Sequence, residues 1–420
     1  MSDRPPRHSD LRYRLISRLI HHPRLLRLAA AMLRRKPSLA RIARVVAGRD
    51  AVAAVFHRQE SFCPAHAPNL RAGEFVIGMA ASRRQQEDRK FLEAVLPAPE
   101  RFAALSAMES RRRIEAIRAS GDDRFDLIDD YMVFVVWRAL RLALGPGGTV
   151  TAQQPTNAEP GEPFKGFVKD LRRLGAQLVI GSVSPSGVRA DADRGAERMN
   201  ERMLPVTPVL KNWWKQKARG SDSSIARNAV GLMWVGHPAT VQAGALCMQE
   251  LFARRAVLDK LSIQAQALGE TVWLNSDFRK LLADHVLELL RFRPPFPILV
   301  RDVPRDTWFD VGKGIPPGRA NAGSQVTLLT IGAMFDDGAV AGGRADKYCP
   351  GRGFNFNGDR YLMFGLGDRS CIAKHQVVAM LVSALAGLLT LPGLRWADPW
   401  SSRIAYDGPT ITRMRLRFDR

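Results

Sequence analysis

The chain has 420 residues, of which 46% are hydrophobic, and this is enough apolar material for a large buried core. Its four cysteines show neither paired zinc spacing nor a dense disulfide pattern, and no apolar run reaches the ~18 residues of a transmembrane helix, so we expect a soluble protein in the reducing cytoplasm. The formal net charge of +22 favours an anionic partner, but nothing resembles a nucleic-acid-binding module, so we expect no nucleic acid among its partners.

A basic leader covers residues 1–45, ahead of a single domain that we assign to residues 46–420. The first ten residues have the composition of a disordered segment. Over residues 11–20 apolar side chains recur at helical spacing with arginines between them, and the pattern repeats beyond Pro23. We expect leader helices that pack on the domain with their arginines in solvent. Peripheral contact with an anionic membrane is the alternative.

The domain is expected to be mainly helical with a small β part. Helical periodicity prevails from Leu92 to Leu289, and residues 220–223 offer caps for a long helix that ends near Arg254. Residues 293–330 are rich in proline, glycine and β-branched side chains and predict a small sheet. The last strand alternates apolar residues with arginines: Met414, Leu416 and Phe418 against Arg413, Arg415 and Arg417.

One stretch carries most of the chemical information, Phe364-Gly365-Leu366-Gly367-Asp368-Arg369-Ser370-Cys371, and a helix is predicted from Lys374 onward. A cysteine at a helix N-terminus is favoured as thiolate, because unpaired backbone N–H groups and the helix dipole point at the sulfur. A thiolate there binds a soft metal centre or acts as a nucleophile. The two glycines permit positive φ and the close approach of a flat group.

This spacing resembles the haem-binding loop of the cytochrome P-450 family, and Ala373 stands where the family usually has a glycine. The resemblance implies the family's fold, a triangular α-rich domain with a long central helix over the haem. It implies haem b as cofactor, with Cys371 as the proximal ligand of the iron. Arg369 would bind a haem propionate, and Phe364 and Gly365 would belong to the cofactor-binding loop.

Further residues match other features of the family. Glu288 and Arg291 lie three residues apart on a predicted helix and therefore share a face. They resemble the family's Glu-x-x-Arg pair, and Arg352 matches the second arginine that braces the scaffold with it. Arg301 and Arg89 match positions of propionate-binding arginines, and such anions need cations with fork geometry.

The centre of the long helix departs from the family's pattern. Oxygen-activating members usually place an acid and then an alcohol there, but with Gly236 as register mark these positions hold Pro238 and Ala239. Thr240 lies one residue late, and a shifted register would restore it as proton carrier. His237-Pro238 resembles the Arg-Pro of peroxide-using fatty-acid hydroxylases, so His237 is a second catalytic candidate. Proline inside a helix bends its axis, and alternatively His237 only packs against the bend expected at Pro238.

The expected substrate is an apolar organic molecule. Its pocket would be roofed by the long helix at Trp234, Gly236 and Ala239, with residues 75–79 as further lining. The leading hypothesis is a monooxygenase that inserts one oxygen atom, with electrons from an acidic ferredoxin or flavodoxin steered by Lys374 and Arg369. We expect a monomer. Two alternatives remain: an enzyme that uses peroxide or rearranges a hydroperoxide without a redox partner, and a non-catalytic haem or lipid-binding protein.

Overall fold

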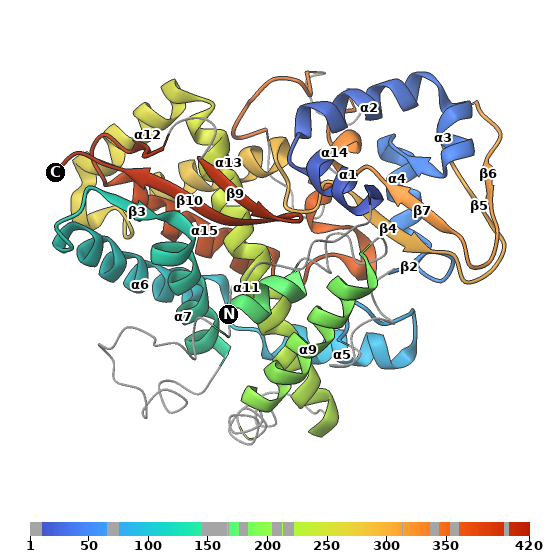
Figure 1. Cartoon of the computed structure of the whole chain (residues 1–420), viewed down its shortest axis with the longest axis horizontal. Helices are drawn as coiled ribbons and strands as arrows, with labels where there is room; N and C mark the ends of the chain where they lie inside the picture. The colour runs from blue at the N-terminus through green and yellow to red at the C-terminus, as the bar shows by residue number, and fades with distance from the viewer. Residues whose placement is uncertain are drawn as a thin grey trace.

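The computed structural model describes residues 11–64, 75–144, 166, 168–175, 184–203, 212, 222–312, 314–336, 344–352, 361–398 and 403–420. The predicted disorder of residues 1–10 therefore lies outside the described residues. Helices dominate the chain, and the long helix α11 runs through the middle of the molecule (Figure 1). No described helix has the length and apolar character needed to span a bilayer.

The principal helices are α1 (Leu11–Ile20), α2 (Pro23–Arg35), α3 (Pro37–Ala43), α4 (Arg49–His57), α5 (Arg83–Val95), α6 (Pro99–Ala119), α7 (Val133–Leu144), α9 (Ser186–Met203), α11 (Asp222–Phe252), α12 (Arg255–Leu268), α13 (Ser276–Phe292), α14 (Thr330–Ala333) and α15 (Lys374–Leu389). Short helical turns of other types are η2 (Leu127–Met132), η5 (Gly269–Thr271), η7 (Leu362–Phe364) and η8 (Gly367–Arg369). The bounds of α11 agree with the long helix expected from the cap residues and the apolar period.

The strands are short: β1 (Val45–Val46), β2 (Cys63–Pro64), β3 (Arg124–Asp126), β4 (Leu299–Asp302), β5 (Thr307–Phe309), β6 (Gly318–Ala320), β7 (Gln325–Leu328), β8 (Arg395–Trp396), β9 (Ile404–Asp407) and β10 (Thr410–Arg417). They form one sheet in the order β1-β7-β4-β2, a second in the order β3-β10-β8 with β9 on β10, and the hairpin β5-β6. The alternation predicted for the last strand is confirmed, because Met414, Leu416 and Phe418 are buried while Arg413 and Arg415 are exposed.

The main core lies where α6, α7, α11, α13 and α15 pack together. Helix α15 is apolar around its whole circumference, and every residue from Met380 to Leu389 is buried, as such a helix requires. Its buried polar groups are satisfied across helices, since the Tyr131 hydroxyl donates to Ala384 O at 2.6 Å and Ser383 Oγ donates to Ala103 O at 2.9 Å. This packing fixes the start of α15, beside which the cysteine loop lies.

The leader helices are packed against the rest of the chain. Leu26 and Ala30 of α2 are buried in a small core with Ile298, Leu329 and Ile331. Arg34 Nη1 donates to Gly332 O at 2.7 Å, which ties α2 to α14. The packing expected from the sequence is thus present, and the boundary drawn at residue 45 falls inside strand β1, which pairs with β7.

Candidate functional site

The cysteine loop closes on itself ahead of α15. The Cys371 N–H donates to Phe364 O at 2.7 Å, and Gly365 and Gly367 adopt φ of +68° and +60°. Glycine suits these positions because other residues pay a steric penalty there. A Cβ at Gly365 would also lie 3.2 Å from Arg369 O. The loop expected from the glycine spacing is therefore formed, with the sulfur-bearing residue directly before α15.

Burial dominates the electrostatics of the thiol. Desolvation raises the pKa of Cys371, and this outweighs the Ala373 N–H and the charges of Arg89 and Lys374, which lower it. Burial therefore outweighs the helix N-terminus, which was expected to favour the thiolate. A stable thiolate at this buried position requires a further positive partner at the sulfur, and a coordinated metal ion is such a partner.

Two arginines beside the loop, Arg369 and Arg301, have no anionic partner among the described residues. Arg369 Nε donates to Gln59 Oε1 at 2.8 Å and Nη1 donates to Val76 O at 3.2 Å, whereas its buried Nη2 has no partner among the described residues. Arg301 on β4 is 9% exposed, and burial together with the charge of Arg369 lowers its pKa to about 10. Within the described ranges neither guanidinium forms an ion pair. A buried guanidinium with a second, partly buried one close enough to affect its pKa calls for a carboxylate ligand, so these residues fit the propionates of a haem.

Arg89 approaches the same loop from α5. Its Nη1 donates to Ser370 O at 2.8 Å, and Nη2 lies 3.3 Å from Ser370 Oγ. Its Nε pairs with the half-exposed Glu93. Arg89 thus holds the residue that precedes Cys371, and contact with a propionate stays a prediction. Gln59, which binds both Arg369 and Asp368, was missed because an isolated glutamine beyond α4 carries no sequence signal.

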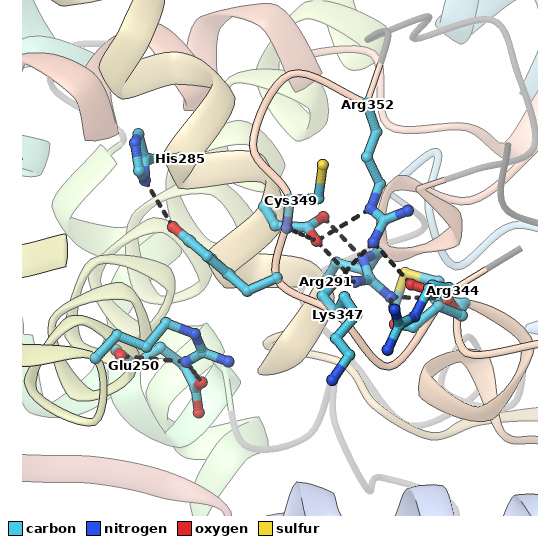
Figure 2. Close-up of polar contacts among 12 residues, drawn as sticks. Glu250, His285, Arg291, Arg344, Lys347, Cys349 and Arg352 are labelled. Carbon is cyan, nitrogen blue, oxygen red and sulfur yellow. Dashed lines mark hydrogen bonds and ion pairs between the residues drawn. The ribbon is translucent and has the colours of Figure 1, made fainter. Parts of the chain in front are cut away.

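The three residues predicted to form a brace, Glu288, Arg291 and Arg352, lie together (Figure 2). Arg291 donates from Nη2 and Nε to the two carboxylate oxygens of Glu288, at 2.7 and 2.8 Å, so the ion pair is bidentate. The side chains of Arg291 and Glu288 are 2% and 0% exposed. Arg352 Nε reaches Glu288 Oε1 at 3.4 Å, and the Cys349 N–H donates to the same oxygen at 3.0 Å. Arg291 also donates to three backbone carbonyls: those of Met334, Ala345 and Lys347. Helix α13 is thereby fastened to residues 344–352.

A neighbouring polar network joins α11 to α13. Glu250 accepts from Arg254 and, at 2.8 Å, from Arg293 Nε, while His285 and the Tyr348 hydroxyl lie 2.7 Å apart (Figure 2). The opposing arginines lower the pKa of Glu250 despite its burial. Sequence reasoning did not single out this cluster, since its members are dispersed along the chain.

His237 faces α7. Its Nε2 lies 3.1 Å from Val133 O, its ring stands edge-on to Trp137 at 6.3 Å, and the residue is 2% exposed. Burial lowers the pKa of His237 to about 4, so the ring is neutral near pH 7. A Cβ at Gly236 would contact Leu140, which places Gly236 on the same side. The structure therefore shows the packed arrangement that the sequence left as the alternative for His237.

The opposite side of α11, at Pro238 and Ala239, lines a cleft. Its walls come from the α1–α2 turn, α11, the proline-rich turn after α13 and the β9–β10 turn, and include Ile20, His21, Pro238, Ala239, Phe296 and Ile411. The empty volume is about 570 Å³, part of it open to solvent. Ala239 thus lines a cleft, and its place in a substrate pocket stays a prediction. The side chain of Trp234 lies outside the described residues.

Thr240 does not share the cleft side of α11. At ~100° per residue it lies ~40° from Gly236 and ~60° from His237, both of which face α7. Its buried Oγ1 has no partner among the described residues. Phe75, which was expected among the further lining of the substrate pocket, packs on α11 at Gly231. A Cβ added at Gly231 would overlap the Phe75 ring. The predicted roles of Thr240 and His237 in proton transfer stay predictions.

The amino-acid sequence of the chain has little similarity to that of known proteins. No protein-family model matches the chain. Cytochrome P450 4g15 of Drosophila melanogaster is 20% identical over 246 residues, which cover 56% of this chain and 42% of the fly protein. The chain thus spans less than half the length of the curated relative it matches.

Solved structures superpose over most of the chain. P450BioI, solved with an acyl carrier protein ligated to hexadec-9Z-enoic acid, has a TM-score of 0.67 at 16% identity and covers 89% of this chain and 92% of its own. CalO2 has a TM-score of 0.66 at 17% identity, with 93% and 97% covered. CYP109B1 from Bacillus subtilis has a TM-score of 0.66 at 17% identity, with 89% and 93% covered. The chain therefore has the cytochrome P450 fold, as the resemblance of its cysteine loop implied.

Proposed function

We propose that this chain is a haem-thiolate monooxygenase acting on an apolar organic substrate. The observation that carries the proposal is a partly buried cysteine, in a glycine-shaped loop before α15, beside two arginines, Arg301 and Arg369, that form no ion pair with any described acid. A bound haem b would supply oxygen activation, with a thiolate ligand that favours O–O cleavage. Cys371 Sγ would be that ligand.

The chain's own residues bind and orient the cofactor. Arg301 and Arg369 would hold its carboxylates, because the charge of Arg369 acts on the buried Arg301 and Nη2 of Arg369 has no partner among the described residues. Arg89 positions the loop through Ser370. The buried ion pair of Glu288 and Arg291 fixes the scaffold behind it. The cleft beside Ala239 admits the substrate, and apolar walls from Ile20 and Phe296 favour an apolar molecule.

The net positive charge of the chain favours an acidic protein as electron donor. A formal charge of +22 attracts acidic proteins, and Lys374 lies at the start of α15 three residues after Cys371. We propose that an acidic ferredoxin or flavodoxin docks near the start of α15, where Lys374 steers the encounter.

A second candidate is oxygenation driven by peroxide, without a redox partner. One observation favours it: on the cleft side α11 presents Pro238 and Ala239, neither of which moves a proton. The polar atoms that α11 adds to the cleft belong to Gln242, and both bond the Ile411 backbone, at 2.9 Å each.

The cofactor assignment is tested by the ferrous–CO absorption spectrum of purified protein. We expect a red-shifted thiolate-type band that is lost in Cys371→Ala and retained in the matched control Cys349→Ala, whose residue is exposed. Absence of haem even after reconstitution would overturn the proposal, as would an unchanged band in Cys371→Ala.

The oxidant is tested by supplying candidate substrates with either reduced ferredoxin and oxygen or hydrogen peroxide alone. Turnover with peroxide alone selects the second candidate, and turnover only with the electron supply selects the first. His237→Ala and Thr240→Ala then locate proton transfer. From their α7-facing placement we expect product formed per electron consumed to stay near the wild-type value in both.

A further inference from the structure

Large apolar side chains are exposed in unusual number on the leader helices. Of the fourteen exposed large hydrophobic residues among the described part of the chain, seven lie between residues 11 and 42. We call these seven the N-terminal apolar surface: Leu11, Leu15, Leu25, Leu28, Met32, Leu39 and Ile42. Single exposed leucines are ordinary, but a concentration on three consecutive helices indicates an interaction site.

Helix α2 shows why this exposure is not a by-product of packing. It carries two apolar stripes, and only the one with Leu26 and Ala30 faces the body. Leu25, Leu28 and Met32 follow at spacings of three and four on the other side and are 52%, 60% and 58% exposed. A helix that merely packs on a core needs one apolar stripe, so the second requires another partner.

The flanking helices repeat the arrangement. On α1, Leu11 and Leu15 are four residues apart and 78% and 62% exposed, with Arg18 exposed beside them. On α3, Leu39 and Ile42 are 52% and 76% exposed, with exposed Arg41 between them. Figure 1 shows α1, α2 and α3 together at one outer corner of the molecule.

The same helices carry concentrated positive charge. Residues 11–49 contain eleven lysines and arginines and no acidic residue. Arg24, Arg35 and Lys36 lie along the exposed stripe of α2, and the described residues provide none of the three with an ion pair. The surface is therefore apolar and cationic together.

The apolar character and the positive charge of the N-terminal apolar surface together distinguish between possible partners. A second copy of the chain would bring the same arginines against one another in a two-fold interface. A nucleic acid would neutralise the charge but leave the leucines in water. An anionic bilayer meets both requirements, since acyl chains take the apolar side chains while head groups neutralise the flanking cations.

We propose that the N-terminal apolar surface docks α1, α2 and α3 on an anionic membrane without spanning it. The turn between α1 and α2 also lines the cleft, through Ile20 and His21, so the docked surface adjoins the cleft.

Vesicle flotation of the full chain tests this proposal, with vesicles of phosphatidylcholine alone or mixed equally with phosphatidylglycerol. We expect binding to the mixed vesicles only, weakened by salt. Leu28→Ser/Met32→Ser should lower the partition coefficient at least ~10-fold, since removing the equivalent of two methylene groups at ~0.8 kcal/mol each suffices for this. Arg24→Gln/Arg35→Gln should lower it ~30-fold, at ~1 kcal/mol for each cation near the surface.

Matched controls make the result specific. Ile263→Ser/Leu274→Ser changes side chains that are 68% and 76% exposed elsewhere, and Arg413→Gln/Arg415→Gln removes the same charge from β10, so both should bind as wild type. Thermal unfolding verifies that every variant is folded. Equal binding of Leu28→Ser/Met32→Ser and wild type would overturn the proposal, as would equal binding to neutral vesicles. Light scattering that shows a wild-type dimer, dissociated by Leu28→Ser/Met32→Ser, would assign the surface to a second copy instead.

Discussion

The ion pair between Glu288 and Arg291 is the interaction whose removal should destabilise the scaffold most clearly. Glu288→Gln keeps the shape of the side chain but leaves Arg291 as a buried cation, and Arg291 is 2% exposed. Breaking a buried pair in this way costs ~3–5 kcal/mol, a large part of the ~5–15 kcal/mol that stabilises a typical folded protein. With an unfolding entropy of ~2.1 cal/mol/K per residue, the 420 residues give a fall in Tm of about 3–6 °C.

The assay is thermal unfolding followed by circular dichroism, with and without added haem, and it includes a matched exposed pair. Arg255 and Asp259 lie 2.8 Å apart but are 54% and 47% exposed, so Asp259→Asn should cost under ~0.5 kcal/mol. Arg291→Met should be as harmful as Glu288→Gln, and the double variant should lose less than the sum, because no unpaired partner remains within the pair. Equal Tm values for Glu288→Gln and Asp259→Asn would refute the reasoning.

Three further predictions concern the leader, the loop and the long helix. Leu26→Ala removes a side chain that is 1% exposed and should cost ~2–5 kcal/mol in urea unfolding, whereas Leu28→Ala, at a position 60% exposed, should cost under ~0.5 kcal/mol; equal effects would mean that α2 is not part of the core. Gly365→Ala places a side chain at φ +68° and ψ −178°, a region that essentially only glycine adopts, and should cost ~1–3 kcal/mol and weaken haem retention, which a haem-transfer assay to apomyoglobin measures. Burial lowers the pKa of His237 to about 4, so the unfolded chain binds the extra proton between pH 6.5 and 4 and stability falls as pH falls through that window. In His237→Asn the slope of unfolding free energy against pH should drop by up to ~1.4 kcal/mol per pH unit there, and an unchanged slope would show that the ring is not buried neutral.

Much of this fold follows from local patterns. The alternation around Met414 and Leu416 predicts a strand with one buried side, and an i,i+3 spacing places Glu288 and Arg291 on one face of α13. These inferences need only the geometry of a single element. The cysteine loop is of the same kind, because glycine positions limit the backbone wherever the loop lies.

Other features depend on how elements are rotated against one another, which no local pattern contains. The arginines of the leader and the apolar period of α2 are plain in the sequence, but only packing decides that Leu26 turns inward and Leu28 outward. Arg301 and Arg369 are far apart in the chain and meet only because β4 and the cysteine loop lie close together. The resemblance to the cytochrome P-450 family predicted a propionate-binding role for both arginines. Hydrophobic periodicity could not have predicted it, because it describes a single helix or strand.

The rotation of α11 has the largest consequence for chemistry. Within one turn of this helix the polar side chains point away from the cleft. His237 hydrogen-bonds to Val133 O of α7, and Thr240 lies between His237 and Gly236 around the helix axis. Pro238 and Ala239 are left on the cleft side, where Gln242 is already bonded to Ile411 through both of its polar atoms. If a proton is delivered in this cleft, it does not come from α11, because the described α11 side chains that reach the cleft offer no free acid. A substrate with its own acidic group would meet that need. Pro238 and Ala239 stand where oxygen-activating members of the family usually have an acid and an alcohol. This difference thus bears on which molecule the cleft accepts as well as on which oxidant the protein uses.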